Sequence, residues 1–339
     1  MRREARNVAS ALLLFAPSAP VACLLPSRPR RPFPANLLRR MTSIAPLNAV
    51  PSPSGGASPQ WDGVTSEYER RVEPFTLKFG EDMLRDMLGS TAAGTGKGEG
   101  GNDPRTHKIL DLGCGTGGLS LLAASLPGCL VTAVDVSPSM ADRTRLRSSA
   151  LGLAVDCAVS DGQSLPPGWS GSFDCALANF SVIFFPEPTG GVREVLRCLQ
   201  PGGVIALSAW GDDSETAAFQ VFPDAAADVI PDAGGKIRPL RITGSRDALT
   251  KLLGDAGFVD VRVIGPVTHS LAVTSPEEYY LRFALTSPPI IEMIDGMAEE
   301  TREIFKTKVM ELATERGGLS DGGISLDMSA YLAFGTKPP

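Results

Sequence analysis

The stretch Lys108–Gly118, with the sequence KILDLGCGTGG, decides the fold of this chain. An apolar run typical of a β-strand holds one acid, Asp111, and breaks into a glycine-rich turn, after which a helical segment spans 119–125. A strand, a glycine turn and a helix in this order form the entrance of nucleotide sites in α/β proteins. The free N–H groups at the start of such a helix favour a carboxylate or a phosphate. The stretch therefore predicts a nucleotide site.

The spacing of the glycines leaves the kind of nucleotide open. Gly113, Gly115 and Gly117 form the pattern GxGxG, whereas the dinucleotide fingerprint GxGxxG needs a glycine at position 118. Gly118 is present, so both patterns fit the same turn. A glycine turn that binds no ligand is the third interpretation, because short glycine motifs also occur in ordinary turns. The rest of the chain must decide among the three.

Length and composition limit the possible classes of protein. The 339 residues fit one α/β domain of about 200–250 residues preceded by a leader, or two smaller domains. The net charge of −6 argues against a general nucleic-acid-binding protein. No run reaches the ~18 apolar residues that a membrane-spanning helix needs. The six cysteines form no CxxC pair and there are two histidines, so we expect no metal site.

Residues 1–58 differ in composition from the rest of the chain. They hold eight arginines, many prolines and a single acid, Glu4. An arginine-rich, acid-poor leader is typical of targeting to a mitochondrion or a plastid. We therefore predict a targeting leader and a disordered linker over 1–58, followed by one folded domain over 59–339.

Three other interpretations of this leader stay open. The apolar run 11–16, which follows three arginines, could be the core of a signal peptide. A start at Met41 would remove most of the leader and leave the protein in the cytoplasm. The segment could also be a disordered tail that carries no address.

From Trp61 onward, helical and strand patterns alternate. Residues 66–88 have apolar side chains at helical spacing, and Pro74 should divide them into two helices. The Gly/Thr/Ala-rich segment 89–103 is predicted to be a mobile loop. Nearly continuous apolar strands separated by helices predict a doubly wound α/β fold, with a mostly parallel sheet covered on both faces. The predicted strands are 108–112, 129–135, 153–159, 173–179, 204–210, 259–264 and 331–336.

Two inserts interrupt this alternation in the second half of the chain. Segments 211–244 and 268–328 follow the fifth and sixth predicted strands, and both contain helical patterns. Ligands of open parallel sheets bind beyond the carboxyl ends of the strands. We therefore predict that the two inserts cover the ligand as helical lids.

Two acids end neighbouring strands at places that suit a nucleoside. Asp135 ends the second strand, where a carboxylate accepts hydrogen bonds from both hydroxyl groups of a ribose. Asp161, which is followed by Gly162, comes after the third strand and could meet the amino group of an adenine. NAD and S-adenosylmethionine both contain a ribose, so Asp135 alone does not separate them.

Five motifs occur in a fixed order along the chain. They are Ile109–Gly117 (ILDLGCGTG), Val134–Met140 (VDVSPSM), Asp161–Gly162, Phe173–Asp174 and Leu199–Gly203 (LQPGG). Together they resemble class I S-adenosylmethionine-dependent methyltransferases, and within these most closely the ubiquinone/menaquinone-type branch that acts on small molecules. The resemblance covers 61–336. It implies a Rossmann-like methyltransferase fold with seven strands, of which the last is antiparallel.

The resemblance also implies which residues bind the cofactor. Asp111 and the following turn would hold the methionine end of S-adenosylmethionine, and Asp135 its ribose. Val136 and Met140 would flank the adenine, and Tyr68 would close the site. The implied cofactor-binding residues are Tyr68, Asp111, Gly113, Cys114, Gly115, Thr116, Gly117, Asp135, Val136, Met140, Asp161, Gly162, Asn179 and Phe180.

The implied reaction places few demands on acid–base side chains. The cofactor's sulfonium makes its methyl group electrophilic, so the protein mainly has to align an acceptor and exclude water. We predict transfer of this methyl group to a small, partly apolar acceptor, and we name no general base. The predicted walls of the acceptor site, each of which could equally be a core residue, are Phe184, Phe185, Trp210, His269, Tyr279 and Tyr280.

Two other functions remain possible at this point. A nicotinamide-dependent oxidoreductase could use the same glycine turn, although the Asp161–Gly162 pair and the Pro-Gly-Gly turn argue against it and no Tyr-x-x-x-Lys pair is present. A cofactor-binding assembly protein without catalysis would keep the same turn and Asp135. The identity of the acceptor, the acceptor atom and the oligomeric state do not follow from the sequence.

Overall fold

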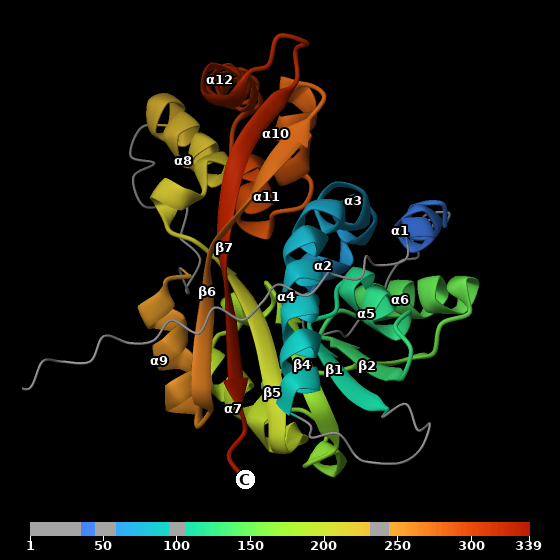
Figure 1. Cartoon of the computed structure of the whole chain (residues 1–339). Coiled ribbons are helices and arrows are strands. Elements are labelled where there is room, and N and C mark those ends of the chain that lie inside the picture. The colour runs from blue at the N-terminus through green and yellow to red at the C-terminus, as the bar shows by residue number, and fades with distance from the viewer. Residues whose placement is uncertain (1–34, 45–58, 95–105, 231–243) are drawn as a thin grey trace, which may run out of the picture. The chain divides into compact units, whose positions relative to one another are not determined.

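A seven-stranded sheet in the order β3-β2-β1-β4-β5-β7-β6 forms the centre of the computed structural model (Figure 1). The structure describes residues 35–44, 59–94, 106–230 and 244–339. Of the described strands, β7 alone runs in the direction opposite to the others. The prediction of a doubly wound, mostly parallel sheet is therefore confirmed. The strands are β1 (His107–Leu112), β2 (Cys129–Asp135), β3 (Val155–Val159), β4 (Phe173–Asn179), β5 (Leu199–Trp210), β6 (Val259–Val273) and β7 (Ile324–Thr336).

Helices cover both faces of the sheet, since its central strands are apolar on both sides. Ile109, Leu110 and Leu112 of β1 are fully buried. Helices α4, α5 and α6 pack on one another, and α7 packs on α9; Figure 1 shows α4 in front of the sheet and α7 behind it. These helices are α3 (Thr65–Arg71), α4 (Glu73–Gly94), α5 (Gly118–Ala124), α6 (Pro138–Leu151), α7 (Pro188–Cys198) and α9 (Arg246–Ala256). Short 3-10 helices span Pro167–Trp169, Val182–Phe184 and Asp213–Glu215.

The N-terminal region differs from the prediction in two places. Helix α1 (Ala35–Thr42) lies against α6 and buries Leu37 and Met41, so this part of the predicted leader and linker is folded. Helix α2 (Pro59–Asp62) also contacts α6. Helix α4 continues to Gly94, into the segment predicted to be a loop. The rest of the predicted leader and linker, 1–34 and 45–58, lies outside the described residues, and its targeting role stays a prediction.

Pro74 divides the N-terminal helical region as predicted. It lies in the first turn of α4, where proline is tolerated because that N–H has no partner within the helix. Helix α3 ends at Arg71, directly before this start. The break lets α3 and α4 turn relative to each other, and both helices contribute side chains to the site described below.

The two inserts form one helical layer at the carboxyl ends of the strands. Helix α8 (Ala217–Val229) of the first insert packs on α12 (Glu299–Gly317) of the second, and α10 (Pro276–Ala284) packs on α11 (Pro288–Asp295) and α12. Figure 1 shows these four helices gathered at one end of the sheet. The predicted bounds of the second insert were too wide. Strands β6 and β7 are longer than predicted and pair as far as Val273 and Ile324, so the insert spans 274–323.

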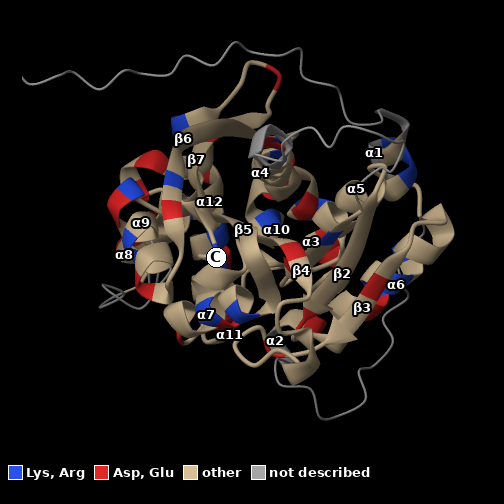
Figure 2. Cartoon of the chain, turned by 60° about the horizontal axis from the view of Figure 1, so that its bottom comes forward, with Lys and Arg blue, Asp and Glu red and all other residues tan. Residues whose placement is uncertain are grey.

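The helices on the outside of the sheet carry charges of both signs. Figure 2 shows acidic and basic residues together on α6 and α9. On α9, for example, Lys251 and Asp255 form an ion pair with 2.7 Å between Nζ and Oδ2. Among the described residues, we find no helix with the length and apolar character that crossing a bilayer requires.

Candidate active site

A cavity of about 640 Å³ lies at the carboxyl ends of β1, β2 and β4, between the N-terminal helices and the helices of the inserts. Polar groups line one end of it, and aromatic groups line the other. The polar end comprises Gly113, Gly115, Asp135, Ser160, Asp161 and Gln163. The aromatic end comprises Phe75, Phe180, Trp210, Phe219, Phe222 and Phe283.

The glycine turn after β1 brings bare main chain to the cavity wall. Gly113 has a φ of +68°, and a Cβ atom there would lie 2.4 Å from the Cβ atom of Ser181. The hydroxyl of Ser181 donates a hydrogen bond to the carbonyl of Leu112 at 2.6 Å, which holds the two segments at this spacing. At Gly118 a Cβ atom would lie 2.1 Å from Oε1 of Glu73. Gly118, which kept the dinucleotide pattern open, therefore has a packing role against α4.

Asp135 holds the glycine turn and also faces the cavity. Its Oδ2 accepts a hydrogen bond from the N–H of Gly115 at 2.8 Å, and its Oδ1 accepts one from the N–H of Ser137 at 2.9 Å. Burial raises the pKa of Asp135, and the two backbone N–H groups act in the opposite direction. Each carboxylate oxygen retains further acceptor capacity. The residue can therefore stabilise the turn and accept hydroxyl groups of a ligand at the same time.

Asp111 lies at the base of a recess of about 30 Å³ that adjoins the cavity. It is 1% exposed, and Oγ of Ser120 donates a hydrogen bond to its Oδ2 at 2.5 Å. Burial raises the pKa of Asp111 to about 7; the bond from Ser120 lowers the pKa, and the charge of Asp135 raises it further. A buried carboxyl group at this pKa suits a cationic group, which would favour its ionised form.

A chain of hydrogen bonds fixes the end of β4. The N–H of Phe180 donates to Oγ of Ser208 at 2.9 Å, and that hydroxyl donates to Oδ1 of Asn179 at 2.8 Å. Nδ2 of Asn179 then donates to the carbonyl of Thr76 on α4 at 3.2 Å. Phe180 has a φ of +54°, which is rare for a residue with a side chain and is found preferentially at functional sites. Strands β4 and β5 and helix α4 are joined at this point.

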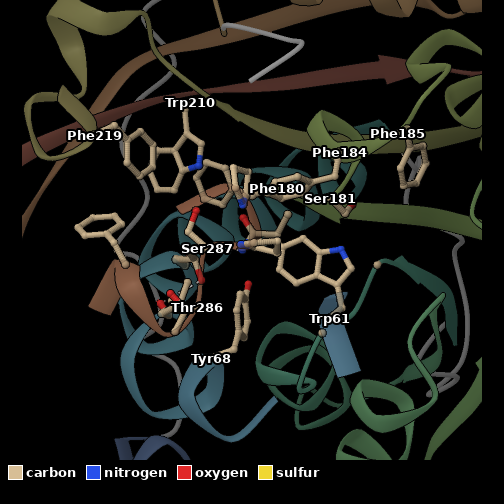
Figure 3. Close-up of a pocket in the computed structure, with 18 of the residues that line it drawn as sticks. Trp61, Tyr68, Phe180, Ser181, Phe184, Phe185, Trp210, Phe219, Thr286 and Ser287 are labelled. Carbon is tan, nitrogen blue, oxygen red and sulfur yellow. Dashed lines mark hydrogen bonds between the residues drawn. The ribbon is translucent and has the colours of Figure 1, made fainter. Parts of the chain in front are cut away.

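Aromatic side chains from the ends of β4 and β5, from α4 and from the inserts pack together at one end of the cavity. The rings of Phe180 and Trp210 are stacked with their centroids 3.8 Å apart, and Phe219 meets Trp210 edge-on at 5.2 Å. Figure 3 shows Trp210 and Phe219 on one side of the cavity and Tyr68 and Trp61 on the other. Such a site combines an apolar body with a few placed polar groups, as pockets for small organic molecules do.

Comparison with known proteins shows which family the residues around this site resemble. Residues 110–207 match the family described as a methyltransferase domain. The chain carries a class I S-adenosylmethionine-dependent methyltransferase domain. The matched residues run from β1 to β5 and include the glycine turn, Asp135 and Asn179. The resemblance drawn from the five motifs is thereby confirmed at the level of the class.

Individual relatives cover parts of the domain. The chain is 37% identical over 106 residues to a ubiquinone biosynthesis O-methyltransferase of Xanthomonas axonopodis pv. citri, in a match that covers 31% of this chain and 44% of that protein. It is 28% identical over 153 residues to an uncharacterized protein of Mycobacterium tuberculosis, covering 44% of this chain and 52% of that protein. The chain thus spans about half the length of the curated relatives that it matches.

Solved structures with a similar arrangement include a putative methyltransferase from Bacillus halodurans. It is 19% identical, the alignment covers 75% of this chain and 99% of that one, and the TM-score is 0.47.

Most of the predicted cofactor-binding residues reach the cavity of the methyltransferase domain. Asp111, Cys114 and Thr116 line the adjoining recess instead. Gly117 lies at neither place: it begins α5 with a φ of +91° and packs against Thr144. The predicted residues that line the cavity are Tyr68, Gly113, Gly115, Asp135, Val136, Met140, Asp161, Gly162, Asn179 and Phe180, together with Phe184, Phe185 and Trp210 of the predicted acceptor walls.

Three predicted acceptor-site residues lie elsewhere. His269 belongs to β6, and its Nε2 lies 3.0 Å from Oδ2 of Asp82. Tyr279 is fully buried, and its hydroxyl donates to the carbonyl of Ala218 at 2.5 Å, so it joins α10 to α8. Tyr280 stacks on Phe222 with 6.0 Å between centroids. The prediction was wrong for these three residues, because both tyrosines face the packing between lid helices and β6 extends past His269.

Some residues that line the cavity were not predicted from the sequence. Trp61 meets Phe184 edge-on with 5.0 Å between centroids, so a residue of α2 reaches the rim beside the segment after β4. Arg282 comes from α10 of the second insert. No sequence motif includes these positions. Trp61, an isolated tryptophan at the start of the globular sequence, could have been chosen as a candidate site residue.

Proposed function

We propose that this protein transfers the methyl group of S-adenosylmethionine to a small, partly apolar organic acceptor. The observation that carries the proposal is the continuous cavity, which runs from the glycine turn and Asp135 to an aromatic end formed by α4, the ends of β4 and β5, and the inserts. A cofactor site and an acceptor site need to share one enclosed space for a direct transfer. The names of the Xanthomonas relatives make an oxygen nucleophile the first acceptor atom to test.

The residues fit the cofactor by the chemistry of their donors and acceptors. Asp135 would accept the ribose hydroxyls, Asp161 would meet the adenine edge, and the main chain of Gly113 and Gly115 would contact the methionine end. When bound, the cofactor supplies an electrophilic methyl group. The stacked pair Phe180–Trp210 would orient the acceptor and exclude water from the reacting atoms.

A binding experiment separates this proposal from its rivals. Calorimetric titration of the full chain should show binding of S-adenosylhomocysteine and no binding of NAD. Incubation with methyl-labelled cofactor and a panel of small hydroxylated, amino and carbon acceptors should then give a labelled product detectable by mass spectrometry. Binding of NAD without S-adenosylhomocysteine would favour the oxidoreductase, and cofactor binding without turnover of any acceptor would favour an assembly protein.

We expect the affinity for S-adenosylhomocysteine to rise with pH because of Asp111. The pKa of this carboxyl group is about 7, and its ionised form would pair with the ligand's amino group, which is a cation throughout this range. The ionised fraction, and with it the affinity, should rise about tenfold between pH 6 and pH 8. Calorimetry at several pH values tests this, and Asp111→Asn should flatten the profile. A slope that persists in the variant would assign it to another group.

The raised pKa of Asp111 also determines how the stability of the ligand-free protein changes with pH. The pKa of Asp111 is higher in the folded state than its ordinary value near 4, so the folded state retains the proton when the unfolded state has lost it. The free energy of unfolding should therefore fall as the pH rises from about 4 to about 7. Asp111→Asn should remove that part of the decrease, which denaturant titrations at matched pH values would detect.

A further inference from the structure

Arg282 places a positive charge in the cavity and forms no ion pair with any residue of the described part of the chain. It belongs to α10 and lines the cavity beside Phe283 and Thr286. Its guanidinium forms no hydrogen bond and no ion pair with the residues that the structure describes, and its Nε is buried. Arg282 as a whole is half-buried, and a cation partly removed from water is stabilised by a ligand that supplies a counter-ion.

Glu278 and Arg71 are the charged groups that act on Arg282, and neither forms an ion pair with it. Glu278, one turn earlier on α10, accepts hydrogen bonds from the N–H and the hydroxyl of Thr274 at 2.8 and 2.5 Å. Arg71 is paired with Glu67, with 2.7 Å between Nε and Oε2. Burial lowers the pKa of Arg282 to about 10; the charge of Glu278 acts against this shift, and the charge of Arg71 adds to it. The guanidinium stays protonated at neutral pH, and no carboxylate of the described residues forms an ion pair with it.

The position of the charge distinguishes the acceptor end of the cavity from the cofactor end. Arg282 is the one lysine or arginine among the described residues that line the cavity. The acids Asp135 and Asp161 lie at the cofactor end, and a third lining acid, Asp213, is exposed on the 3-10 helix after β5. The lining around Arg282 on α10 and α11 is otherwise made of aromatic, aliphatic and hydroxyl side chains, namely Phe283, Thr286, Ser287, Pro288, Pro289 and Ile290. A ligand that fits this end has an apolar body and one negative charge.

We propose that Arg282 binds a carboxylate of the methyl acceptor, so that the substrate class is the apolar carboxylic acids. This inference rests on the proposed methyl transfer and names its substrate class. A guanidinium donates two parallel hydrogen bonds to a carboxylate, and this geometry gives both strength and orientation. The carboxylate then serves as the anchor, and the methyl-accepting atom lies elsewhere on the molecule. A single lining cation suits a monoanion better than a phosphate dianion, and it disfavours protonated amines.

Matched pairs of ligands test the proposal directly. The full chain, saturated with S-adenosylhomocysteine, is titrated with apolar carboxylic acids and with the primary amide of each, for example cinnamic acid with cinnamamide and dodecanoic acid with dodecanamide. Acid and amide have similar shapes and differ in charge. We expect the acids to bind at least about tenfold more tightly than their amides, as the loss of a charge-assisted pair implies.

Two variants of Arg282 test whether this residue causes the preference for acids over amides. Arg282→Gln should remove the preference for the acid, whereas Arg282→Lys should retain part of it, because an ammonium keeps the charge but not the paired donors. Arg316→Gln is the matched control: Arg316 lies on α12 of the same lid and pairs with Asp224, with 2.7 Å between Nη2 and Oδ2. Melting curves of all three variants separate a loss of binding from a loss of folding.

The outcomes are distinct. An acid preference that disappears in Arg282→Gln and persists in Arg316→Gln supports the proposal. Equal binding of acids and amides, binding of no acid at all, or a preference that Arg282→Gln leaves unchanged overturns it. If S-adenosylhomocysteine fails to bind, the proposed function fails, and the same titration without it still decides whether Arg282 selects carboxylates.

Discussion

Replacing Arg147 by methionine should lower the free energy of unfolding by about 3–5 kcal/mol, because it leaves a buried carboxylate without its partner. Nη1 of Arg147 donates to both carboxylate oxygens of Glu73, at 2.9 and 2.7 Å, and to the carbonyl of Thr116 at 2.6 Å. Both side chains are at most 10% exposed. Denaturant titration of the variant gives the loss of stability.

The position of this pair makes the effect larger than that of an ordinary ion pair. Glu73 begins α4 and packs directly on Gly118, while Arg147 comes from α6 and also reaches the glycine turn at Thr116. Burial raises the pKa of Glu73, and the charge of Arg147 acts against this shift. Without the arginine, Glu73 must be protonated or exposed to water. The affinity for S-adenosylhomocysteine should fall as well, since the turn loses its support.

Two further variants test the cause. Arg70→Met breaks the pair with Glu67 on α3, where the arginine side chain is 62% exposed, and should change the stability by less than about 1 kcal/mol. Adding Glu73→Gln to Arg147→Met should recover part of the lost stability, because the uncompensated charge is then removed. A double variant that is less stable than Arg147→Met would show that packing, and not charge, dominates at this position.

The sequence predicted the central strands well because each is a short apolar run between turn signals. Buried strands β1 and β4 leave little choice of face or boundary, and their ends carry Asp111 and Asn179. The extensions of β6 and β7 were missed because they alternate: along β6, buried Leu271 and Val273 are separated by an exposed residue. This part of β6 is a strand because it pairs with β7, which lies more than fifty residues later in the chain.

The cofactor end of the site was also more predictable than the acceptor end. Gly113 and Asp135 act through the local geometry of a turn and a strand end, which the sequence encodes within a few residues. The acceptor end is lined by residues of α4, α8 and α10 together with Phe180 and Trp210, and the mutual placement of these elements depends on tertiary packing. Tyr279 and Arg282 lie within one turn of the same helix, yet one is core and the other lines the cavity.

Asp135→Asn should weaken binding of S-adenosylhomocysteine by about tenfold or more, the effect of losing a charge-assisted hydrogen bond of about 1.5–3 kcal/mol. Asp135 is 8% exposed and faces the cavity, so a ribose hydroxyl would meet its carboxylate with little competition from water. The amide of the variant keeps one acceptor oxygen, which can accept the hydrogen bond from the N–H of Gly115 or of Ser137 but not both. Calorimetry measures the affinity, and Asp156→Asn, an exposed acid on neighbouring β3, is the matched control.

A second ligand separates contact with the ribose from support of the turn. In the natural chain, 2′-deoxy-S-adenosylhomocysteine should bind more weakly than S-adenosylhomocysteine, because one hydroxyl donor to Asp135 is missing. If the carboxylate contacts that hydroxyl, the difference between the two ligands should shrink in Asp135→Asn, since the two changes remove the same interaction. If Asp135 only holds the turn, both ligands should lose the same factor in affinity and the difference should persist. The coupling between the variant and the ligand thus decides which role the carboxylate has.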